Sequence, residues 1–332
     1  MSPVVSVIIP AYNTENYIAR AIQSALYQTL TNLEVIVIDD ASTDSTVEII
    51  KSFSDPRLKV FVNQQNMGVS AARNRALKEA QGEWIAILDS DDWYATERLE
   101  KLIQVAIAQG ADIVIDDLNF IQSNGKSPWS TLLQESGKQI SSITTIDPTY
   151  FVKTDLYGKQ GLHLGLSKPL FRRSFLLKYD ISYDEEMLVV EDFHFMLQCL
   201  INNALCVLIP QPYYYYCYRP GSLITQSKTR HIAQASRSIQ YFLQQETRKS
   251  NSQLVQALWE SFVILKKNEA YYSVAELLKQ KEILKALLQS IRRPYFFIHF
   301  IGKLQPILLR RFKYYILKDK LVYERADRRH NN

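Results

Sequence analysis

The sequence predicts an α/β protein built on a doubly wound, mostly parallel β-sheet, with a helical, basic C-terminal extension. Two observations support this fold class. Short apolar runs alternate with segments in which apolar residues recur every three or four positions, as when strands alternate with amphipathic helices. The 332 residues are 47% hydrophobic, which is enough to bury a large core.

Three predicted strands end in polar residues that carry chemistry. These strands and the residues after them are 4–9 with Pro10, Ala11, Tyr12 and Asn13, 33–38 with Asp39 and Asp40, and 85–88 with Asp89, Ser90, Asp91 and Asp92. Further strands are expected at 58–62 and 113–115, with amphipathic helices between the strands. Ligands of such sheets bind beyond the carboxyl ends of the strands, so these groups are expected to converge at one edge.

The acids Asp89, Asp91 and Asp92 follow the central strand directly. Carboxylates this close repel one another and are costly to desolvate, which favours a cation among them. Mg²⁺ or Mn²⁺ suits carboxylate ligands and leaves positions open for substrate phosphates. A solvated turn that caps the next helix is the simpler interpretation of an isolated Asp-x-Asp, so the surrounding motifs must decide.

No glycine-rich phosphate loop follows any predicted strand, which argues against dinucleotide binding and ATP hydrolysis. Residues 161–168 include two glycines and Lys168, but their order and spacing differ from those of a P-loop. The sequence instead predicts a nucleotide held by carboxylates, an aromatic ring and a metal. Arg73 is near enough in the chain to serve the phosphates of that nucleotide.

The chain is expected to comprise two halves of one domain and a helical region, at residues 1–120, 121–228 and 229–332. Residues 122–147 are polar and aperiodic, which indicates a loop or a boundary. Glu191 and Asp192 open a predicted helix, where the helix dipole alone would favour acids. Residues 213–218 are interpreted as an aromatic core strand rather than a stacking platform.

The formal charge of +5 is concentrated in the tail. Residues 291–332 carry eleven Lys and Arg against three Asp and Glu, a net charge of +8, which leaves −3 on the rest of the chain. Because this tail is also rich in Ile, Leu and aromatic residues, it favours an anionic membrane surface over nucleic acid; packing on the core is an equal alternative. Residues 254–288 offer a helical face for a homodimer.

Cys199, Cys206 and Cys217 are odd in number and lack the Cys-x-x-Cys spacing of a zinc site, which favours a reducing compartment. The N-terminus shows no signal-peptide pattern, and the late apolar stretch at 295–309 is too short and too polar to span a bilayer. The predicted location is therefore the cytoplasm, peripherally on the inner face of the plasma membrane.

Together these residues resemble the motifs of a family-2 glycosyltransferase, which has the nucleotide-diphospho-sugar transferase (GT-A) fold. The matching segments are 7–13, 37–44, 66–74, 82–85 and 88–92, in the order that the family shows. Two later segments, 167–173 and 191–192, match more loosely, and no counterpart is found after residue 230 or so.

The resemblance implies a UDP-sugar donor. It makes residues 1–120 the nucleotide-sugar-binding half and residues 121–228 the acceptor-binding half of one domain. The implied donor-binding residues are Pro10, Ala11, Tyr12, Asn13, Asp40, Asn66, Arg73, Asp89 and Ser90. Tyr12 would lie against the base, Asp40 would accept the imide N–H of uracil, and Arg73 would contact the phosphates. Asp91 would ligate Mn²⁺ or Mg²⁺, Asp89 would reach the metal through water or contact the ribose, and Asp92 would be structural.

The resemblance also implies inverting transfer to a hydroxyl of a saccharide or lipid-linked acceptor, in cell-surface polysaccharide or glycoconjugate synthesis. Asp192 would be the catalytic base, with Glu191 and Lys168 on the acceptor side. Two alternatives stay open. One is a catalytically silent glycan- or membrane-binding relative. The other is a nucleotidyltransferase, although the glycine-rich basic loop of that class is missing after Ile9.

Overall fold

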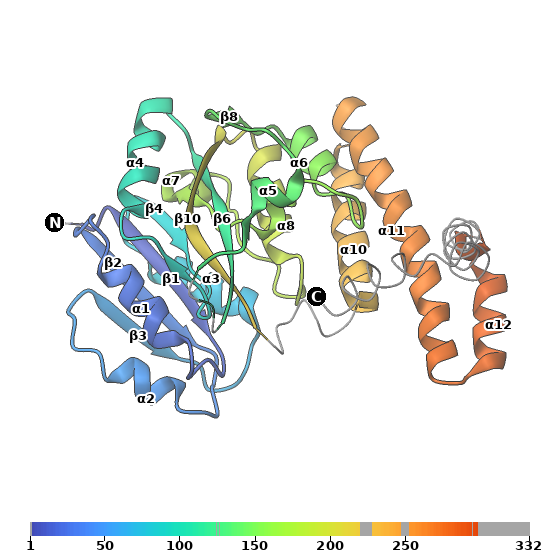
Figure 1. Ribbon diagram of the computed structural model, residues 1–332, viewed down its shortest axis with the longest axis horizontal. Helices are drawn as coiled ribbons and strands as arrows, with labels where there is room; N and C mark the ends of the chain where they lie inside the picture. Colours follow the sequence, from blue (N-terminus) through green and yellow to red (C-terminus); the bar gives the residue numbers. More distant parts are fainter. Residues whose placement is uncertain are drawn as a thin grey trace, which may run out of the picture.

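The computed structural model describes residues 2–123, 125, 127–219, 228–246, 252–293 and 295–297. A ten-stranded sheet has the order β3-β2-β1-β4-β9-β6-β10-β5, with β7 beside β6 and β8 beside β10. Figure 1 shows helices around this sheet and the last helices extending away from it as an arm. The predicted fold class, a mostly parallel α/β sheet with a helical C-terminal region, is confirmed.

The first half of the sheet is parallel. β1 (Val5–Ala11) lies between β2 (Leu33–Asp39) and β4 (Trp84–Ile87), and β3 (Leu58–Val62) lies outside β2. All seven residues of β1 and all seven of β2 are buried. Burial on both faces explains why these strands read as almost continuous apolar runs rather than as an alternating pattern.

The second half continues the same sheet. β6 (Ile113–Gln122) and β10 (Cys206–Tyr218) form a long parallel pair, and β9 (Leu170–Arg172) lies antiparallel between β4 and β6. Three short strands complete the sheet: β5 (Trp93–Tyr94), β7 (Ser130–Thr131) and β8 (Thr144–Thr145). β9 was not predicted, because three residues are too few to show a period.

Most predicted helices are present where the apolar spacing placed them. The predicted helices are α1 (Ile18–Leu26), α2 (Thr46–Lys51), α3 (Val69–Glu79), α4 (Arg98–Gln109) and α8 (Glu191–Ile201). Three short helices were not predicted, namely α5 (Leu132–Ser136), α6 (Pro148–Thr154) and α7 (Arg173–Lys178), and a 3-10 turn lies at Leu164–Leu166. The prediction of a loop at 122–147 is wrong for α5. A capping box, in which Thr131 and Gln134 satisfy each other's backbone N–H groups, begins that helix.

Within the described residues, three helices follow β10: α10 (Lys228–Glu246), α11 (Ser252–Lys279) and α12 (Ile283–Arg292). α10 packs on the core through Ile232, Ile239 and Phe242, and α11 lies against α10, α6 and α12. In the part of the chain that the structure describes, no helix is long and apolar enough to cross a membrane. Most of the basic tail, residues 298–332, lies outside the described residues. The three cysteines are buried and free.

Candidate active site

The carboxyl ends of β1 and β2 lie side by side, and the loops that follow them are tied together. The Asn13 Oδ1 accepts a hydrogen bond from the Thr43 N–H (2.8 Å), and the Asn13 N–H donates to Ser42 Oγ (2.9 Å). Pro10 and Ala11 end β1 itself. Tyr12, the next residue, is 46% exposed, so this loop presents an aromatic ring at the edge of the sheet.

Asp40 anchors the loop that precedes α3. Its carboxylate accepts hydrogen bonds from Asn63 Nδ2 (2.7 Å), the Met67 N–H (2.9 Å) and the Gly68 N–H (2.7 Å). Gly68 has a φ of 91°, which a residue with a side chain rarely adopts. Asn66 is exposed within this loop. Asp40 therefore holds the loop that presents Asn66, and all its described contacts are to the chain itself.

One face of α3 joins the two halves of the domain. Ser70 Oγ donates to the Met187 carbonyl (3.0 Å), and Asn74 Nδ2 donates to the Tyr183 carbonyl (2.9 Å). The N–H of Tyr183 returns a hydrogen bond to Asn74 Oδ1 (2.8 Å). Arg73 shares this face because positions three and four apart in a helix are neighbours. The segment that leads into α8 is thus held against the first half.

Arg73 and Lys168 bring three carboxylates together. Arg73 Nη2 lies 2.6 Å from Asp89 Oδ1, and its Nη1 lies 2.9 Å from Glu191 Oε1 and 2.8 Å from Asp192 Oδ1. Lys168 Nζ lies 2.6 Å from Asp192 Oδ2 and 3.1 Å from Asp89 Oδ2. Both cations are buried, at 1% and 5% exposure. We call these five residues the charge cluster.

The charge cluster is unbalanced, because three carboxylates face two cations. Burial opposes the ionisation of Asp89, but Lys168 and Arg73 outweigh it and lower the pKa of Asp89 to about 2. Burial, and then the neighbouring Asp192 carboxylate, raise the pKa of Glu191. Within the charge cluster, the surroundings of Glu191 therefore oppose its ionisation.

The two other acids of the run have separate partners. Asp91 Oδ2 pairs with Arg219 Nε at 2.5 Å. Asp92 is buried and accepts hydrogen bonds from the Tyr214 hydroxyl (2.7 Å) and the Cys217 N–H (2.7 Å). Burial, and then the Asp91 and Asp89 carboxylates, raise the pKa of Asp92. Asp92 thus ties the turn to β10, whereas Ser90 is simply buried in the turn.

The carboxylates expected to hold a metal differ in how they are used. Among the described residues, no three His, Cys, Asp or Glu side chains are grouped as a metal ion would need. Both oxygens of Asp89 are ion-paired, whereas the pair that Asp91 makes uses Oδ2. Mg²⁺ often binds through one or two carboxylates together with substrate phosphates. The chemistry of Asp91 fits that role, and Asp89 fits it only if Arg73 and Lys168 move.

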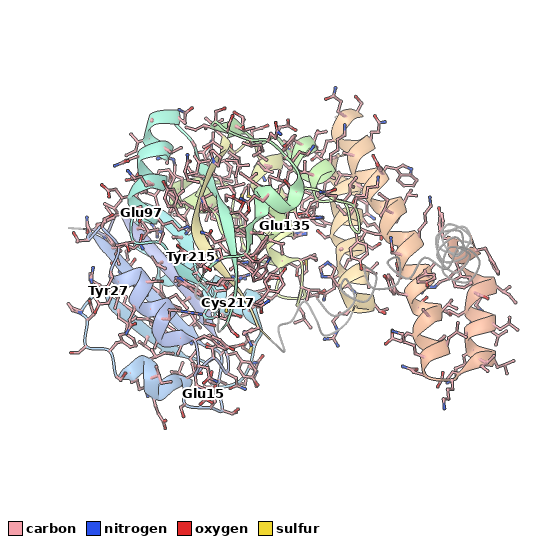
Figure 2. The ribbon with its side chains drawn as sticks, viewed as in Figure 1. Glu15, Tyr27, Glu97, Glu135, Tyr215 and Cys217 are labelled. Atoms are coloured by element: carbon pink, nitrogen blue, oxygen red, sulfur yellow. The ribbon has the colours of Figure 1, made fainter. Side chains whose placement is uncertain are left out.

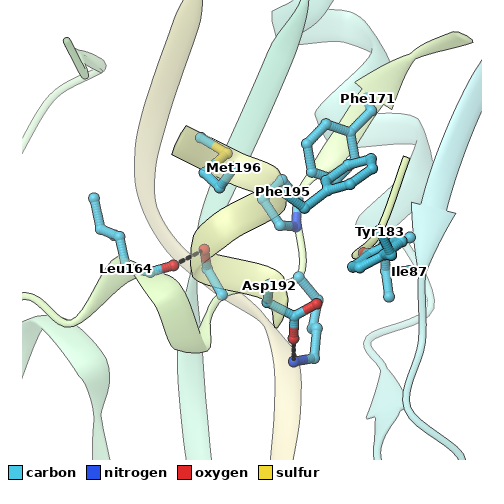
Figure 3. A pocket seen from close by; sticks show the side chains of 10 residues that line it. Ile87, Leu164, Phe171, Tyr183, Asp192, Phe195 and Met196 are labelled. Carbon is cyan, nitrogen blue, oxygen red and sulfur yellow. Dashed lines mark hydrogen bonds and ion pairs between the residues drawn. The ribbon is translucent and has the colours of Figure 1, made fainter. Parts of the chain in front are cut away.

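A narrow cavity lies behind Asp192 (Figure 3). Its volume is about 10 Å³, room for a single water molecule. The dashed line from the Asp192 carboxylate marks its ion pair with Lys168. The apolar part of the cavity lining comes from Ile87, Leu164, Phe171, Phe195 and Met196, among others. A cavity of this size is too small to hold a sugar.

Sequence reasoning missed two features of this site. It assigned Arg73 to phosphates and did not foresee that Arg73 pairs with Glu191 and Asp192, more than a hundred positions away. It also missed Arg219, although this cation directly follows the aromatic strand. The spacing of Ser70, Arg73 and Asn74, three polar residues on one face of a predicted helix, was the available signal for the first.

Comparison with known proteins gives consistent matches. Residues 6–178 match the model described as glycosyl transferase family 2. The succinoglycan biosynthesis protein ExoO of Rhizobium meliloti (strain 1021) is 29% identical over 297 residues, which cover 90% of this chain and 84% of that protein. ExoU, a succinoglycan biosynthesis protein of the same organism, is 31% identical over 243 residues, 71% of this chain and 69% of ExoU.

Among solved structures, S. aureus TarS is similar, with 25% identity and a TM-score of 0.54 over 72% of this chain and 39% of TarS. TarS 1–349 in complex with UDP-GlcNAc is 21% identical, with a TM-score of 0.60 over 90% of this chain and 92% of that one. At the latter identity the likeness shows the fold alone.

Proposed function

The chain belongs to glycosyl transferase family 2, and from this premise we propose that it moves a sugar from a UDP-sugar to a hydroxyl group of a saccharide or lipid-linked acceptor. The proposed setting is polysaccharide or glycoconjugate synthesis, because the similar ExoO is a succinoglycan biosynthesis protein. UDP is the proposed nucleotide because TarS, which shares the fold, was solved with UDP-GlcNAc. The charge cluster carries the proposal, since it joins Asp89 of the first half to Asp192 of the second.

In the proposed reaction, Asp192 is the catalytic base of an inverting transfer. The acceptor oxygen attacks the anomeric carbon from the face opposite the diphosphate, its proton passes to the Asp192 carboxylate, and the bond from sugar to diphosphate breaks to release UDP. Arg73 and Lys168 each hold one Asp192 oxygen. Because the diphosphate would compete for Arg73, we propose that donor binding frees the Asp192 oxygen that Arg73 holds, which can then meet the acceptor.

The donor is proposed to lie along the edge from Tyr12 to Asp89. The exposed ring of Tyr12 would stack on uracil, and the exposed Asn66 would reach the nucleotide from the loop that Asp40 anchors. For Asp40 to accept the imide N–H of uracil, one of its present donors would have to give way. The remaining proposed donor contacts are Pro10, Ala11, Asn13, Arg73 and Ser90.

Asp91 is proposed to hold Mg²⁺ or Mn²⁺. Asp89 would join it, or contact the ribose, once Arg73 turns to the diphosphate and Lys168 to the acceptor. When bound, such an ion would neutralise the charge that develops on the leaving diphosphate. Arg219, which pairs with Asp91, is placed to share that task. Glu191 and Lys168 are proposed to orient the acceptor as it meets Asp192.

The proposal is tested with a panel of UDP-sugars, each with Mn²⁺, Mg²⁺ or a chelator, by measuring UDP release and the shift in melting temperature. We expect one UDP-sugar to stabilise the protein and to release UDP only when a metal is present. Binding of a different nucleotide sugar would overturn the UDP assignment and the role of Asp40. If no nucleotide binds, the protein is better explained as a catalytically silent glycan- or membrane-binding relative. Release of pyrophosphate from a nucleoside triphosphate would instead favour a nucleotidyltransferase.

A second proposal concerns location: we infer that the protein docks on an anionic membrane surface at the inner face of the membrane. α12 carries an apolar stripe of side chains that are all more than half exposed: Ile283, Leu284, Leu287, Leu288 and Ile291. Their spacing puts them on one helix face, and Lys285 and Arg292 lie on the same helix. Apolar side chains beside cations are typical of a helix that lies in a lipid interface.

Sedimentation with phosphatidylglycerol–phosphatidylcholine vesicles tests the docking proposal. We expect the protein to sediment with these vesicles, less so in high salt, and the double variant Leu284→Glu with Leu287→Glu to stay in solution. Ile107→Glu on α4 is the matched control, because Ile107 is 71% exposed on another part of the molecule. Equal sedimentation of the double variant would refute the proposal. A halved mass of the double variant in light scattering would instead assign the stripe to a homodimer.

A further inference from the structure

Four aromatic rings gather at the carboxyl ends of β6 and β10, and we call them the aromatic corner: Phe120, Trp129, Tyr216 and Tyr218. The Phe120 ring contacts the other three at centroid distances of 6.1 Å (Trp129), 5.9 Å (Tyr216) and 5.8 Å (Tyr218). Trp129 and Tyr218 meet directly at 5.1 Å with their planes 63° apart. The corner is therefore one packed unit built by two strands and the turn that follows β6.

The outer part of the aromatic corner is open to solvent. Phe120, at its base, is 6% exposed, whereas Trp129 is 49% exposed and Tyr218 is 47% exposed. A cluster that served only to close the core would be expected to bury its largest rings, because each buried aromatic ring removes a large apolar area from water. Here the two outermost rings are fixed by their neighbours and still present about half their surface.

The aromatic corner continues outward from the candidate active site. Tyr214, Tyr216 and Tyr218 alternate along β10, so they share one face of the strand. On that face the Tyr214 hydroxyl donates to Asp92 and accepts from the Asp89 N–H at 3.2 Å. Tyr216 is the next residue on this face, and its ring centroid lies 5.5 Å from that of Tyr218. The face thus runs from the charge cluster to the exposed rings.

The opposite face of the same strand offers a comparison. There, Tyr215 stacks on Trp93 with centroids 5.2 Å apart, and the Arg20 guanidinium lies 3.4 Å from the centroid of the Trp93 ring. Trp93 is therefore occupied by a tyrosine and by a cation. Figure 2 labels Tyr215 and Cys217 of β10 and Glu135 of α5. Packing against Tyr215 and Arg20 accounts for the presence of Trp93. The contacts of Trp129, in contrast, leave about half of its surface exposed to solvent.

We propose that Trp129 and Tyr218 form a subsite on which a pyranose ring of the acceptor stacks. The apolar C–H face of a pyranose can pack on an aromatic ring, while its hydroxyl groups stay available for hydrogen bonds. Tyr218 is followed directly by Arg219, which pairs with Asp91, so a saccharide on the two rings would lie beside the candidate active site. This inference rests on the proposed function for its role in transfer, but the predicted binding of a saccharide does not need the donor.

The test uses saturation-transfer NMR with the methyl β-pyranosides of glucose, galactose and N-acetylglucosamine. We expect the ring protons of at least one glycoside to receive saturation from the protein, and Trp129→Ala or Tyr218→Ala to weaken its binding about tenfold or more. Tyr218→Phe should bind as the native protein does, because the ring remains. Trp259→Ala is the control, since Trp259 is 57% exposed on α11, away from the site.

Two outcomes would overturn the subsite: no glycoside receives saturation from the native protein up to its solubility limit, or the alanine variants bind as well as the native protein. Trp129→Phe distinguishes a folding defect from a lost contact, because it keeps an aromatic ring at the corner and should restore most of the binding. The UDP-sugar panel is read separately. Glycoside binding without any nucleotide binding would keep the subsite and remove the transferase proposal.

Discussion

Two buried arginines show how the same ion-pair chemistry serves architecture in one place and a reaction site in another. Arg98 meets one acid: its Nε and Nη2 contact Asp116 at 2.8 and 2.7 Å, and the two side chains are 0% and 1% exposed. Arg73 meets three acids whose side chains are 13–23% exposed, and it shares two of them with Lys168.

The Arg98–Asp116 pair is balanced and sealed. Arg98 Nη2 also donates to the Lys168 carbonyl at 2.6 Å, and the guanidinium lies 4.3 Å from the centroid of the Tyr94 ring and 5.1 Å from that of Tyr214, so its surroundings are fully occupied. The charge cluster is unbalanced and open on one side, so an incoming phosphate or hydroxyl can take over some of its contacts. A buried ion pair is therefore an indication of function only when its charges are unequal in number and partly accessible.

The largest expected effect comes from Asp192→Asn, which would separate activity from stability. Asparagine cannot take up the acceptor proton, so transfer should fall about a thousandfold. Stability should change little, because the substitution removes one negative charge from a cluster that has one in excess. UDP release in the presence of donor and acceptor, together with thermal melting, would measure both. A native transfer rate in a variant that binds donor normally would exclude Asp192 as the base.

Arg98→Ala should show the reverse pattern. It leaves the Asp116 carboxylate buried without its partner, which typically costs about 3–5 kcal/mol. Lys159→Ala is the control: its pair with Glu260 is about half exposed, and such pairs contribute about 0–1 kcal/mol. Denaturant unfolding measures both variants. If Arg98→Ala were no more destabilised than Lys159→Ala, the pair would not have the architectural role assigned to it.

Asp89 should contribute an acid-dependent share of stability. Its pKa lies at about 2 in the folded protein against 3.8 ordinarily, so the stabilisation is complete above the ordinary value and is lost as the pH falls toward 2. The shift corresponds to about 2 kcal/mol. Unfolding free energies of the native protein and of Asp89→Asn, measured between pH 6 and pH 2, should therefore converge by that amount. A difference that stays constant with pH would mean that Arg73 and Lys168 do not hold Asp89 ionised.

The position of the site, though not its internal pairing, could be predicted from the sequence. The runs that became β1, β2 and β4 are apolar and uninterrupted, because they are buried on both faces, and the polar residues after them mark the edge. Local pattern is enough for that. The sequence could also predict the family, because the family's motifs lie within short segments. The match of residues 6–178 to glycosyl transferase family 2 confirmed that prediction.

The charge cluster could not be predicted in the same way. Arg73 meets Asp192 only because Asn74 and Ser70 hold the segment before α8 against α3, through contacts that join residues more than a hundred positions apart. Lys168 is placed by two features that leave little sequence signal, the Arg98 contact to its carbonyl and the three-residue strand β9. The same limit applies to the aromatic corner. Residues 213–218 were predicted to be core, which holds for Tyr214 but not for Tyr218, because exposure depends on what packs beside the strand.

The smallest expected effect comes from Glu191→Gln. This variant is also the sharpest test of whether the charge cluster carries more negative than positive charge. Burial and the Asp192 carboxylate raise the pKa of Glu191 above its usual 4.5, so the folded state binds the proton more tightly than the unfolded chain does. Such a group contributes stability that is fully present below the ordinary pKa and is lost as the pH rises through the folded pKa. Glutamine does not titrate.

Relative to the native protein, Glu191→Gln should therefore gain stability as the pH rises from 4 to 8, even though it exchanges a charged contact to Arg73 for a neutral one worth about 1 kcal/mol less. The slope of the difference is the quantity to measure, by denaturant unfolding at several pH values, and Asp89→Asn should give the opposite slope on the acid side. If the stability of Glu191→Gln relative to the native protein fell as the pH rose, the cations of the cluster would be favouring the ionised form of Glu191. The positive and negative charges of the cluster would then be matched, as they are in the pair of Arg98 and Asp116.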